Sequence, residues 1–314
     1  MNEQCMIEMF SRIHKTSPYN ADAEILPLKD TNLLVSTDSF SEREDFLFGL
    51  KPEAMGRVMA YGAITDILAC GAKPEYLVQS WNIDRSHDES FYERVAIGIQ
   101  EVVSNYGAKV VGGDMGVAGD WCWTATVFGE SVSPVRRIAS KRIDFDLYLT
   151  GSCGAANVAA FSHRPLPEPP FREPVPASAL FATDVSGGFF DALENIRRVN
   201  NGIWMDVDGC SALNPEIFST VPDGADPGWA LVGGVGEYEL LFALPNEFDF
   251  LPEGMLPMCY PADHPKGGFI PNWAMWFVLE LEDYYIRNND KASIMPFKEK
   301  VYKLMEKTAE IFTG

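Results

Sequence analysis

Acidic residues recur beside short apolar segments of this sequence, and their type and placement suggest metal or phosphate chemistry. Asp38 and Asp114 each follow a short apolar run, and Asp66 lies within an apolar stretch. Asp22 comes just before another apolar segment, and Asp184 follows one. A buried carboxylate without a partner is costly, so each of these acids needs a cation, a hydrogen-bond network or an exposed cleft.

Several carboxylates gathered in one place would supply the hard oxygen ligands that Mg²⁺ prefers. The alternative for any one of them is a structural role, because aspartate often caps a helix or a turn. The glycines in Gly112-Gly113-Asp114 would let the backbone approach a phosphate, although paired glycines are also common in turns. Neither the P-loop nor the dinucleotide-binding glycine pattern occurs in the sequence, so a nucleotide would have to be bound in another way.

The first half of the chain is predicted to contain strands and helices that position these acids. Apolar runs that end in polar residues predict strands, and apolar residues at helical spacing predict helices. In chain order, we predict strand 33–38, helix 52–69, strand 76–83, helix 86–106, strand 109–114 and strand 121–130. This order favours an α+β arrangement over a purely parallel, doubly wound sheet.

A polar and basic segment at residues 132–144 is predicted to be a linker to a second half. For this half we predict strand 146–150, helix 154–161, a loop at 165–176, a helix after residue 186, and strands 203–207 and 238–244. The segment 165–176 is rich in proline, which lacks an N–H and blocks regular structure. We therefore predict two α+β domains, at residues 1–135 and 136–314.

The composition narrows the classes of function. A formal net charge of -20 argues against DNA or RNA binding, because proteins that bind nucleic acids usually present a basic surface to the phosphates. No run reaches the roughly 18 apolar residues of a membrane span, and residues 1–24 lack the apolar stretch of a signal peptide. The six cysteines form no C-x-x-C pair, and this pattern is typical of reduced core residues in a cytoplasmic protein.

Three motifs stand in the order typical of a known superfamily, and they are Ser36-Thr37-Asp38, Thr65-Asp66-Ile67 followed by Cys70-Gly71-Ala72-Lys73-Pro74, and Gly112-Gly113-Asp114. They resemble the N-terminal signature of the aminoimidazole-ribonucleotide synthetase superfamily. This superfamily includes the hydrogenase maturation dehydratase, selenophosphate synthetase and thiamine-monophosphate kinase. Later motifs favour the kinase branch, and they are Arg137, Leu149-Thr150-Gly151, Gly154, Asp184-Val185-Ser186, Gly188 and Glu237-Tyr238-Glu239-Leu240-Leu241-Phe242. The resemblance covers about residues 20–245.

The resemblance implies a two-domain α+β fold of the PurM-like type. An N-terminal α/β sandwich domain would bind ATP and metal and pair with a second copy in a homodimer, and an α+β domain would follow. The implied activity is that of an ATP- and Mg²⁺-dependent phosphotransferase. It would move the γ-phosphoryl group of ATP onto thiamine phosphate or a related small phosphorylated metabolite, by positioning and charge neutralisation.

The resemblance also implies roles for individual residues. The residues expected to hold metal are Asp22, Ser36, Thr37, Asp38, Asp66, Asp114, Asp184 and Ser186. Those expected to contact the nucleotide are Thr37, Gly112, Gly113, Asp114 and Arg137. Those expected to act in the phosphoryl transfer are Asp114, Arg137 and Asp184.

Departures from the kinase pattern keep two alternatives open. Asn20-Ala21-Asp22 replaces a glycine followed by two acids, and Glu44-Asp45-Phe46 replaces a valine-histidine-phenylalanine sequence near the substrate. Ala155, Gly187 and Gly236 each replace an acid. One alternative is a related ATP-dependent enzyme that phosphorylates an amide or carbonyl oxygen, and the other is a non-catalytic nucleotide-binding protein.

Overall fold

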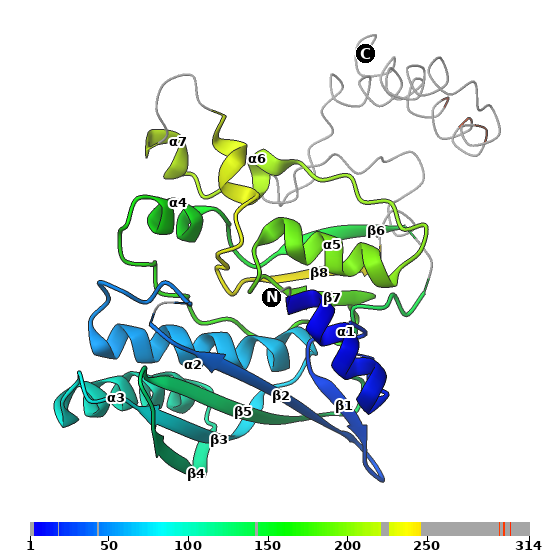
Figure 1. Ribbon diagram of the computed structural model, residues 1–314. Helices are drawn as coiled ribbons and strands as arrows, with labels where there is room; N and C mark the ends of the chain where they lie inside the picture. Colours follow the sequence, from blue (N-terminus) through cyan, green and yellow to red (C-terminus); the bar gives the residue numbers. More distant parts are fainter. Residues whose placement is uncertain are drawn as a thin grey trace. The chain divides into compact units, whose positions relative to one another are not determined.

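The structure is a computed structural model that describes residues 3–17, 19–42, 44–141, 144–220 and 226–245, together with Met295, Lys298 and Tyr302. The chain divides into two compact units, Met1–Pro245 and Asn246–Gly314. The helices and strands of the first unit are labelled in Figure 1. The predicted domain boundary between residues 135 and 136 stays a prediction.

One five-stranded sheet carries the first half of the chain, with the strand order β1-β2-β5-β3-β4. Its strands are β1 (Glu24–Pro27), β2 (Asn32–Phe40), β3 (Pro74–Ile83), β4 (Lys109–Val117) and β5 (Cys122–Ser131). All neighbouring strands are antiparallel except β3 and β4, which are parallel. The parallel pair is connected by the long helix α3 (Glu89–Asn105), as a parallel connection requires. The predicted α+β arrangement is confirmed.

Helix α2 (Pro52–Ala69) is the central element of the unit (Figure 1). It is apolar around most of its circumference, and fourteen of its residues are buried. A helix that is apolar all round must be covered on every side. In this fold, α2 contacts β2 and β5 on one side, α3 along its length, and β7 and β8 on the other side. A polar side chain on the covered part of α2, such as that of the buried Thr65, is therefore held inside the protein.

Two glycines allow α2 and α3 to pack backbone against backbone. A Cβ atom at Gly56 would lie 2.1 Å from the Val95 carbonyl oxygen, and one at Gly98 would lie 2.0 Å from the Glu53 carbonyl oxygen. Such distances are far inside van der Waals contact, so neither position tolerates a side chain without separating the helices. The α2–α3 crossing therefore fixes the position of α2 over the sheet.

A three-stranded antiparallel sheet carries the second half, with the order β6-β8-β7. Its strands are β6 (Phe145–Leu149), β7 (Phe181–Asp184) and β8 (Leu240–Pro245). The helical segments are α4 (Ala155–Phe161), α5 (Phe189–Val199), α6 (Gly209–Ala212), α7 (Ile217–Thr220) and the 3₁₀ helix η1 (Pro227–Leu231). Helix α5 buries Phe189, Ala192 and Ile196, and the last two are one turn apart on one helix face.

Some predicted elements differ from the structure. The strand expected at residues 203–207 is wrong, because this segment is not hydrogen-bonded to any described strand. It does have the predicted alternation. Ile203 and Met205 pack against the apolar core of the second half, which includes Phe181 and Ile196, while Trp204 is 86% exposed. Alternating apolar residues describe an extended segment with one buried face, but a strand also needs a hydrogen-bonding partner.

Strand β2 continues to Phe40 and β4 to Val117, so Asp38 and Asp114 lie within strands and not at their ends. Helix α1 (Glu3–His14) and strand β1 were not predicted from the sequence. Among the described residues, none of the helices has the length and apolar content that a membrane span requires.

The α2–α3 contact gives a direct test of the fold. We expect Gly56→Ala to lower the free energy of unfolding by about 3 kcal/mol, because the added methyl group meets backbone that cannot move alone. Denaturant unfolding followed by circular dichroism measures this change. The control is Gly119→Ala, since a Cβ atom at Gly119 meets nothing within 4 Å. Equal stability of the two variants would contradict the close backbone packing.

Candidate active site

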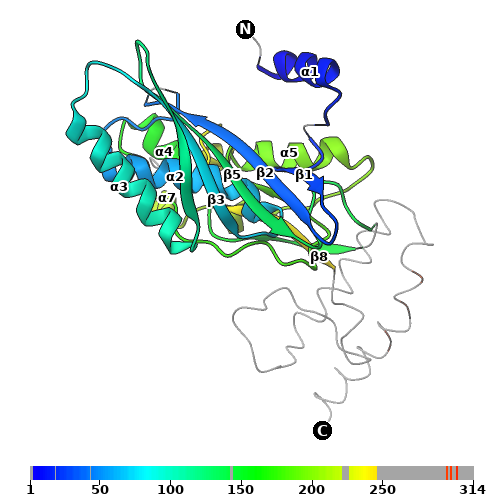
Figure 2. The ribbon, with the colours of Figure 1, turned by 90° about the horizontal axis from the view of Figure 1, so that it is seen from below.

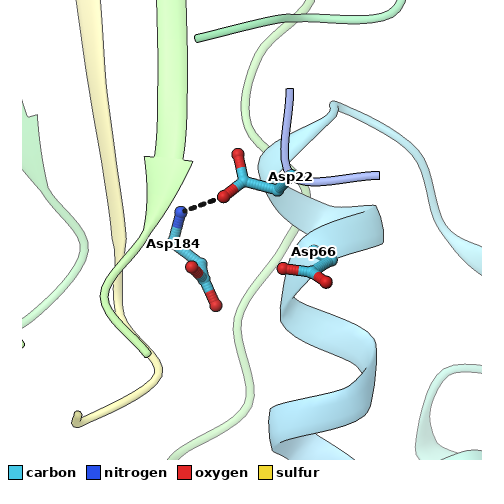
Figure 3. A group of neighbouring side chains, drawn as sticks. All are labelled: Asp22, Asp66 and Asp184. Atoms are coloured by element: carbon cyan, nitrogen blue, oxygen red, sulfur yellow. Dashed lines mark hydrogen bonds between the residues drawn. The ribbon is translucent and has the colours of Figure 1, made fainter. Parts of the chain in front are cut away.

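Three carboxylates from distant parts of the chain converge where the two sheets flank α2. Asp22 lies in the segment before β1, Asp66 on α2, and Asp184 at the end of β7 (Figure 3). One oxygen atom of each lies within 4.8 Å of the others. The predicted metal ligands Asp22, Asp66 and Asp184 are therefore brought together, and their proposed role as ligands stays a prediction.

The side chain of Asp22 is only 1% exposed. Its Oδ1 accepts hydrogen bonds from the Thr183 hydroxyl at 2.9 Å and from the Asp184 N–H at 3.4 Å. Its Oδ2 has no hydrogen-bond partner among the described residues. Buried polar atoms normally have a partner, so this oxygen marks a position that a cation would satisfy.

Arg137 lies against Asp22, and its side chain is 13% exposed. Its Nη2 donates to Asp22 Oδ1, its Nε donates to the Thr183 hydroxyl at 3.0 Å, and its backbone N–H donates to the Asn20 carbonyl at 2.9 Å. These bonds join the segment before β1 to strand β7. The positive charge of Arg137 offsets part of the negative charge of the cluster. Its predicted contact with a phosphate stays a prediction.

Asp184 accepts hydrogen bonds from two hydroxyl groups, Thr65 Oγ1 and Ser186 Oγ, each at 2.9 Å. Burial and the charge of Asp22 raise the pKa of Asp184 to about 7, although Arg137 and the two hydroxyls act in the opposite direction. Ser186, a predicted ligand, therefore contacts the cluster through Asp184. A carboxylate with this pKa is strongly destabilised in its charged form, which a nearby cation would reverse.

Strand β2 adds Ser36 and Asp38 to the same region. The Ser36 hydroxyl donates to Asp66 Oδ2. Burial raises the pKa of Asp66 well above its usual range, and the charges of Asp184 and Asp38 raise it further. Burial also raises the pKa of Asp38 to about 6, with smaller contributions from Asp45 and Asp22. The four aspartates thus repel one another in a poorly solvated place.

Thr37 points to the opposite face of the sheet, because neighbouring residues of a strand alternate. Ser36 is buried and Thr37 is exposed. The Thr37 hydroxyl bonds that of Thr126 at 2.9 Å, and Ser39 bonds Thr124 in the same way at 2.7 Å. Thr37 is therefore not grouped with Asp66 and Asp184, and a metal ligand role for it stays a prediction.

Asp114 is also separate from the carboxylate cluster. It is exposed in the middle of the edge strand β4, opposite Ser80 of β3. The geometry of the strand requires the two glycines before Asp114. The register between β3 and β4 shifts there, Gly112 has a φ of 150°, and a Cβ atom at Gly113 would lie 1.9 Å from the Gln79 carbonyl oxygen. The predicted contact of these residues with a nucleotide stays a prediction.

Two threonines that donate hydrogen bonds to the cluster were not predicted from the sequence as site residues. Thr65 and Thr183 each precede a cluster aspartate, and each donates to the aspartate of another element. The dipeptide Thr-Asp occurs at residues 37–38, 65–66 and 183–184. This recurrence was the signal that could have identified them.

The acids Glu237 and Glu239 are buried in the second half. Glu237 Oε1 accepts from the N–H groups of Gly154 and Ala156 at 2.7 and 2.9 Å. Glu239 accepts from both Nε and Nη2 of Arg172, at 2.6 and 2.7 Å. These pairs tie the segment before β8 to the start of α4 and to the proline-rich loop.

The chain has relatives among known proteins. Residues 20–131 match the model of the family described as AIR synthase related protein, N-terminal domain. The thiamine-monophosphate kinase of Methanospirillum hungatei JF-1 is 27% identical over 296 residues, which cover 87% of this chain and 100% of that protein. The superfamily resemblance predicted from the sequence is confirmed by these matches.

Solved structures share the fold. A structure described as AaThiL complexed with AMPPCP and TMP has a TM-score of 0.67 and 20% identity, and the match covers 78% of this chain and 85% of that one. The hydrogenase maturation protein HypE in complex with ATP has a TM-score of 0.55 and 20% identity, with 79% of each chain covered. At these identities the likeness concerns the fold, and the predicted PurM-like fold is confirmed.

The raised pKa of Asp184 predicts how stability depends on pH. The folded chain holds a proton on Asp184 up to about pH 7, whereas an unfolded aspartate releases it near pH 4. The free energy of unfolding in EDTA therefore falls as the pH rises through this window. We expect Asp184→Asn to be more stable than the unchanged chain at pH 8, with the difference shrinking towards pH 5. Thermal unfolding at several pH values measures it.

The exposed Asp30→Asn is the matched control and should show no such pH-dependent difference. If Asp184→Asn follows the control at every pH, Asp184 does not carry a destabilising charge.

Proposed function

We propose that this chain is an ATP-dependent phosphotransferase that resembles thiamine-monophosphate kinase, acting on thiamine phosphate or a related small phosphorylated metabolite. The observation that carries the proposal is the convergence of Asp22, Asp66 and Asp184, one oxygen atom of each lying within 4.8 Å of the others. Asp22 Oδ2 has no hydrogen-bond partner among the described residues and can accept a further ligand. Curated relatives that match 80% or more of this chain are named thiamine-monophosphate kinases. A structural neighbour was solved with AMPPCP and TMP.

The residues present fit a magnesium site. Asp22, Asp66 and Asp184 offer hard oxygen ligands, and Mg²⁺ is usually held by one or two carboxylates, waters and substrate phosphates. Asp38 lies close enough for its charge to raise the pKa of Asp66. When bound, Mg²⁺ would neutralise charge on the phosphate groups during transfer. The metal is part of the proposal.

The chain's own residues keep the carboxylates in place before any ligand arrives. Thr65, Ser36 and Ser186 each donate a hydroxyl hydrogen bond to one of the aspartates. Arg137 and Thr183 hold Asp22. Phosphoryl transfer depends mainly on positioning and on stabilising charge, so a fixed arrangement lowers the cost of orienting the phosphates.

We also propose a homodimer formed through the open face of the five-stranded sheet. Helices α2 and α3 cover one face of this sheet (Figure 2). The other face exposes Tyr76 and Val78, at 46% and 37%. Tyr76 is in register with the apolar Phe128 and Val35, and Val78 is in register with Thr126 and Thr37. A second copy would bury this surface. Thr37 and Asp114 would then lie at or near the interface.

A cytoplasmic location is proposed as well. The support is that Cys70, Cys122, Cys153 and Cys210 form no disulfide within the part of the chain that the structure describes, and reduced thiols are typical of that compartment.

The kinase proposal is tested by product analysis with ATP, Mg²⁺ and thiamine monophosphate. We expect ADP and a stable phosphorylated product. We expect Asp22→Asn to lower turnover by at least about 100-fold, because replacing a residue that only hydrogen-bonds to a metal ligand already lowers metal affinity or activity by about 10- to 100-fold. The exposed Asp120→Asn is the control. Free phosphate with a dehydrated or cyclised product would favour the alternative ATP chemistry. Binding of a non-hydrolysable ATP analogue without turnover of any acceptor would favour the non-catalytic alternative.

The dimer is tested by analytical ultracentrifugation. We expect Val78→Arg, on the open face of the sheet, to convert a dimer into monomers, because it places a charge in the proposed apolar interface. Ile97→Arg is the matched control, since Ile97 is similarly exposed on α3 over the opposite face. A dimer that is unchanged by Val78→Arg would reject this interface.

A further inference from the structure

Tyr238 has a backbone conformation that is unusual for a large side chain. Its φ is 55°, in the left-handed region, where bulky residues are uncommon outliers. The Tyr238 N–H donates to the Val185 carbonyl at 3.3 Å, and the Val185 N–H donates to the Glu239 carbonyl at 2.8 Å. These two bonds attach Tyr238 beside the residue that follows Asp184. Strained residues are often retained at functional sites, where the surrounding structure holds them.

The residues on both sides of Tyr238 are fixed to the second half of the chain. Glu237 is held by the backbone N–H groups of Gly154 and Ala156. Glu239 is held by Arg172. The strain at Tyr238 is therefore maintained by buried charged groups on either side. This arrangement determines where the Tyr238 ring lies.

The Tyr238 ring packs against α2 beside the carboxylate cluster. A Cβ atom at Gly62 would lie 2.9 Å from Tyr238 Cε1, so only glycine leaves room for the ring there. Gly62 and Asp66 are four residues apart and share one face of the helix. The Thr65 hydroxyl donates both to the Gly62 carbonyl and to Asp184, each at 2.9 Å. One turn of α2 thus connects the ring to the cluster.

The phenol group is a hydrogen-bond donor with no described acceptor. No described residue makes a hydrogen bond with the Tyr238 hydroxyl. Burial raises the pKa of Tyr238, and the charges of Asp45 and Asp38 raise it further. The charge of Asp184 acts in the same direction. The group therefore keeps its proton and can donate it in a hydrogen bond.

A neutral donor has a specific use beside several carboxylates. Phosphate oxygens are repelled by the aspartates that would hold the metal. A fixed O–H group attracts such an oxygen without adding a charge, and donors that are already oriented stabilise anionic groups well.

We propose that Tyr238 contacts the substrate and donates its phenolic hydrogen bond to a phosphate oxygen held at the carboxylate cluster. Tyr238 neither gains nor loses a proton in this role. The chemical class of the ligand is a phosphate ester or pyrophosphate. This inference rests on the proposed function, because it requires phosphate groups to bind at Asp22, Asp66 and Asp184. It adds a residue from the second half to the site.

The test uses Tyr238→Phe, which keeps the ring packing and removes only the hydroxyl. Isothermal titration with inorganic pyrophosphate and Mg²⁺ serves as the probe, because it needs no acceptor and no turnover. We expect the Kd of the variant to rise about tenfold, as for the loss of a hydrogen bond to a charged group. Where turnover is measurable, kcat should fall by a similar or larger factor. The melting temperature should remain that of the unchanged chain.

Tyr92→Phe is the matched control. Its hydroxyl donates to Asp84 Oδ1 at 3.0 Å, so this variant loses a structural hydrogen bond between α3 and the segment after β3, which does not hold Tyr238. We expect it to alter the melting temperature and to leave the Kd for pyrophosphate unchanged.

The outcomes separate the two proposals. Equal pyrophosphate affinity in the unchanged chain and in Tyr238→Phe overturns the role of Tyr238 and leaves the kinase proposal standing. A weaker affinity that is matched by Tyr92→Phe also overturns it, because the effect would then be structural. If the unchanged chain binds no pyrophosphate with Mg²⁺, both proposals fail.

Discussion

The mutual repulsion of buried carboxylates is the constraint on which the site depends. Asp22, Asp66 and Asp184 lie close together in a poorly solvated place, where the charge of Asp22 raises the pKa of both Asp184 and Asp66, and the charge of Asp184 raises the pKa of Asp66. Unpaired, this charge would cost much of the stability of a typical domain. Arg137 and several hydroxyl groups offset part of the cost. The remaining negative charge gives the site its affinity for a cation.

Helix α2 connects the carboxylate cluster to both sheets of the fold. Most of it is buried, so Thr65 and Asp66, which lie in its covered second half, must find partners inside the protein. The partners come from β2 on one side and from β7 on the other. The close α2–α3 crossing at Gly56 and Gly98 keeps the helix in place. The cluster is thus assembled by the packing of one helix between two sheets.

The alternation of a strand divides the predicted site residues between two places. Asp38 faces α2 and the cluster, whereas Thr37 lies on the open face of the sheet with the hydroxyl rows. Asp114 is on the edge strand, exposed and opposite Ser80. The side chains of the motif Ser36-Thr37-Asp38 therefore lie on two opposite faces of the sheet. The inner surface carries the buried carboxylates, and the outer surface is the one proposed to meet a second copy.

The sequence by itself determined the residue types and the local periods. The apolar runs beside Asp38 and Asp184, the helix at residues 52–69 and the order of the motifs were readable because they depend on near neighbours. The sequence did not show that the strands continue past Asp38 and Asp114, or that residues 203–207 lack a strand partner. Tertiary structure alone decided that Asp22 meets Asp184, 162 positions away, and that Tyr238 lies against α2. Burial, repulsion and hydrogen bonding depend on distances in space, which spacing along the chain does not contain.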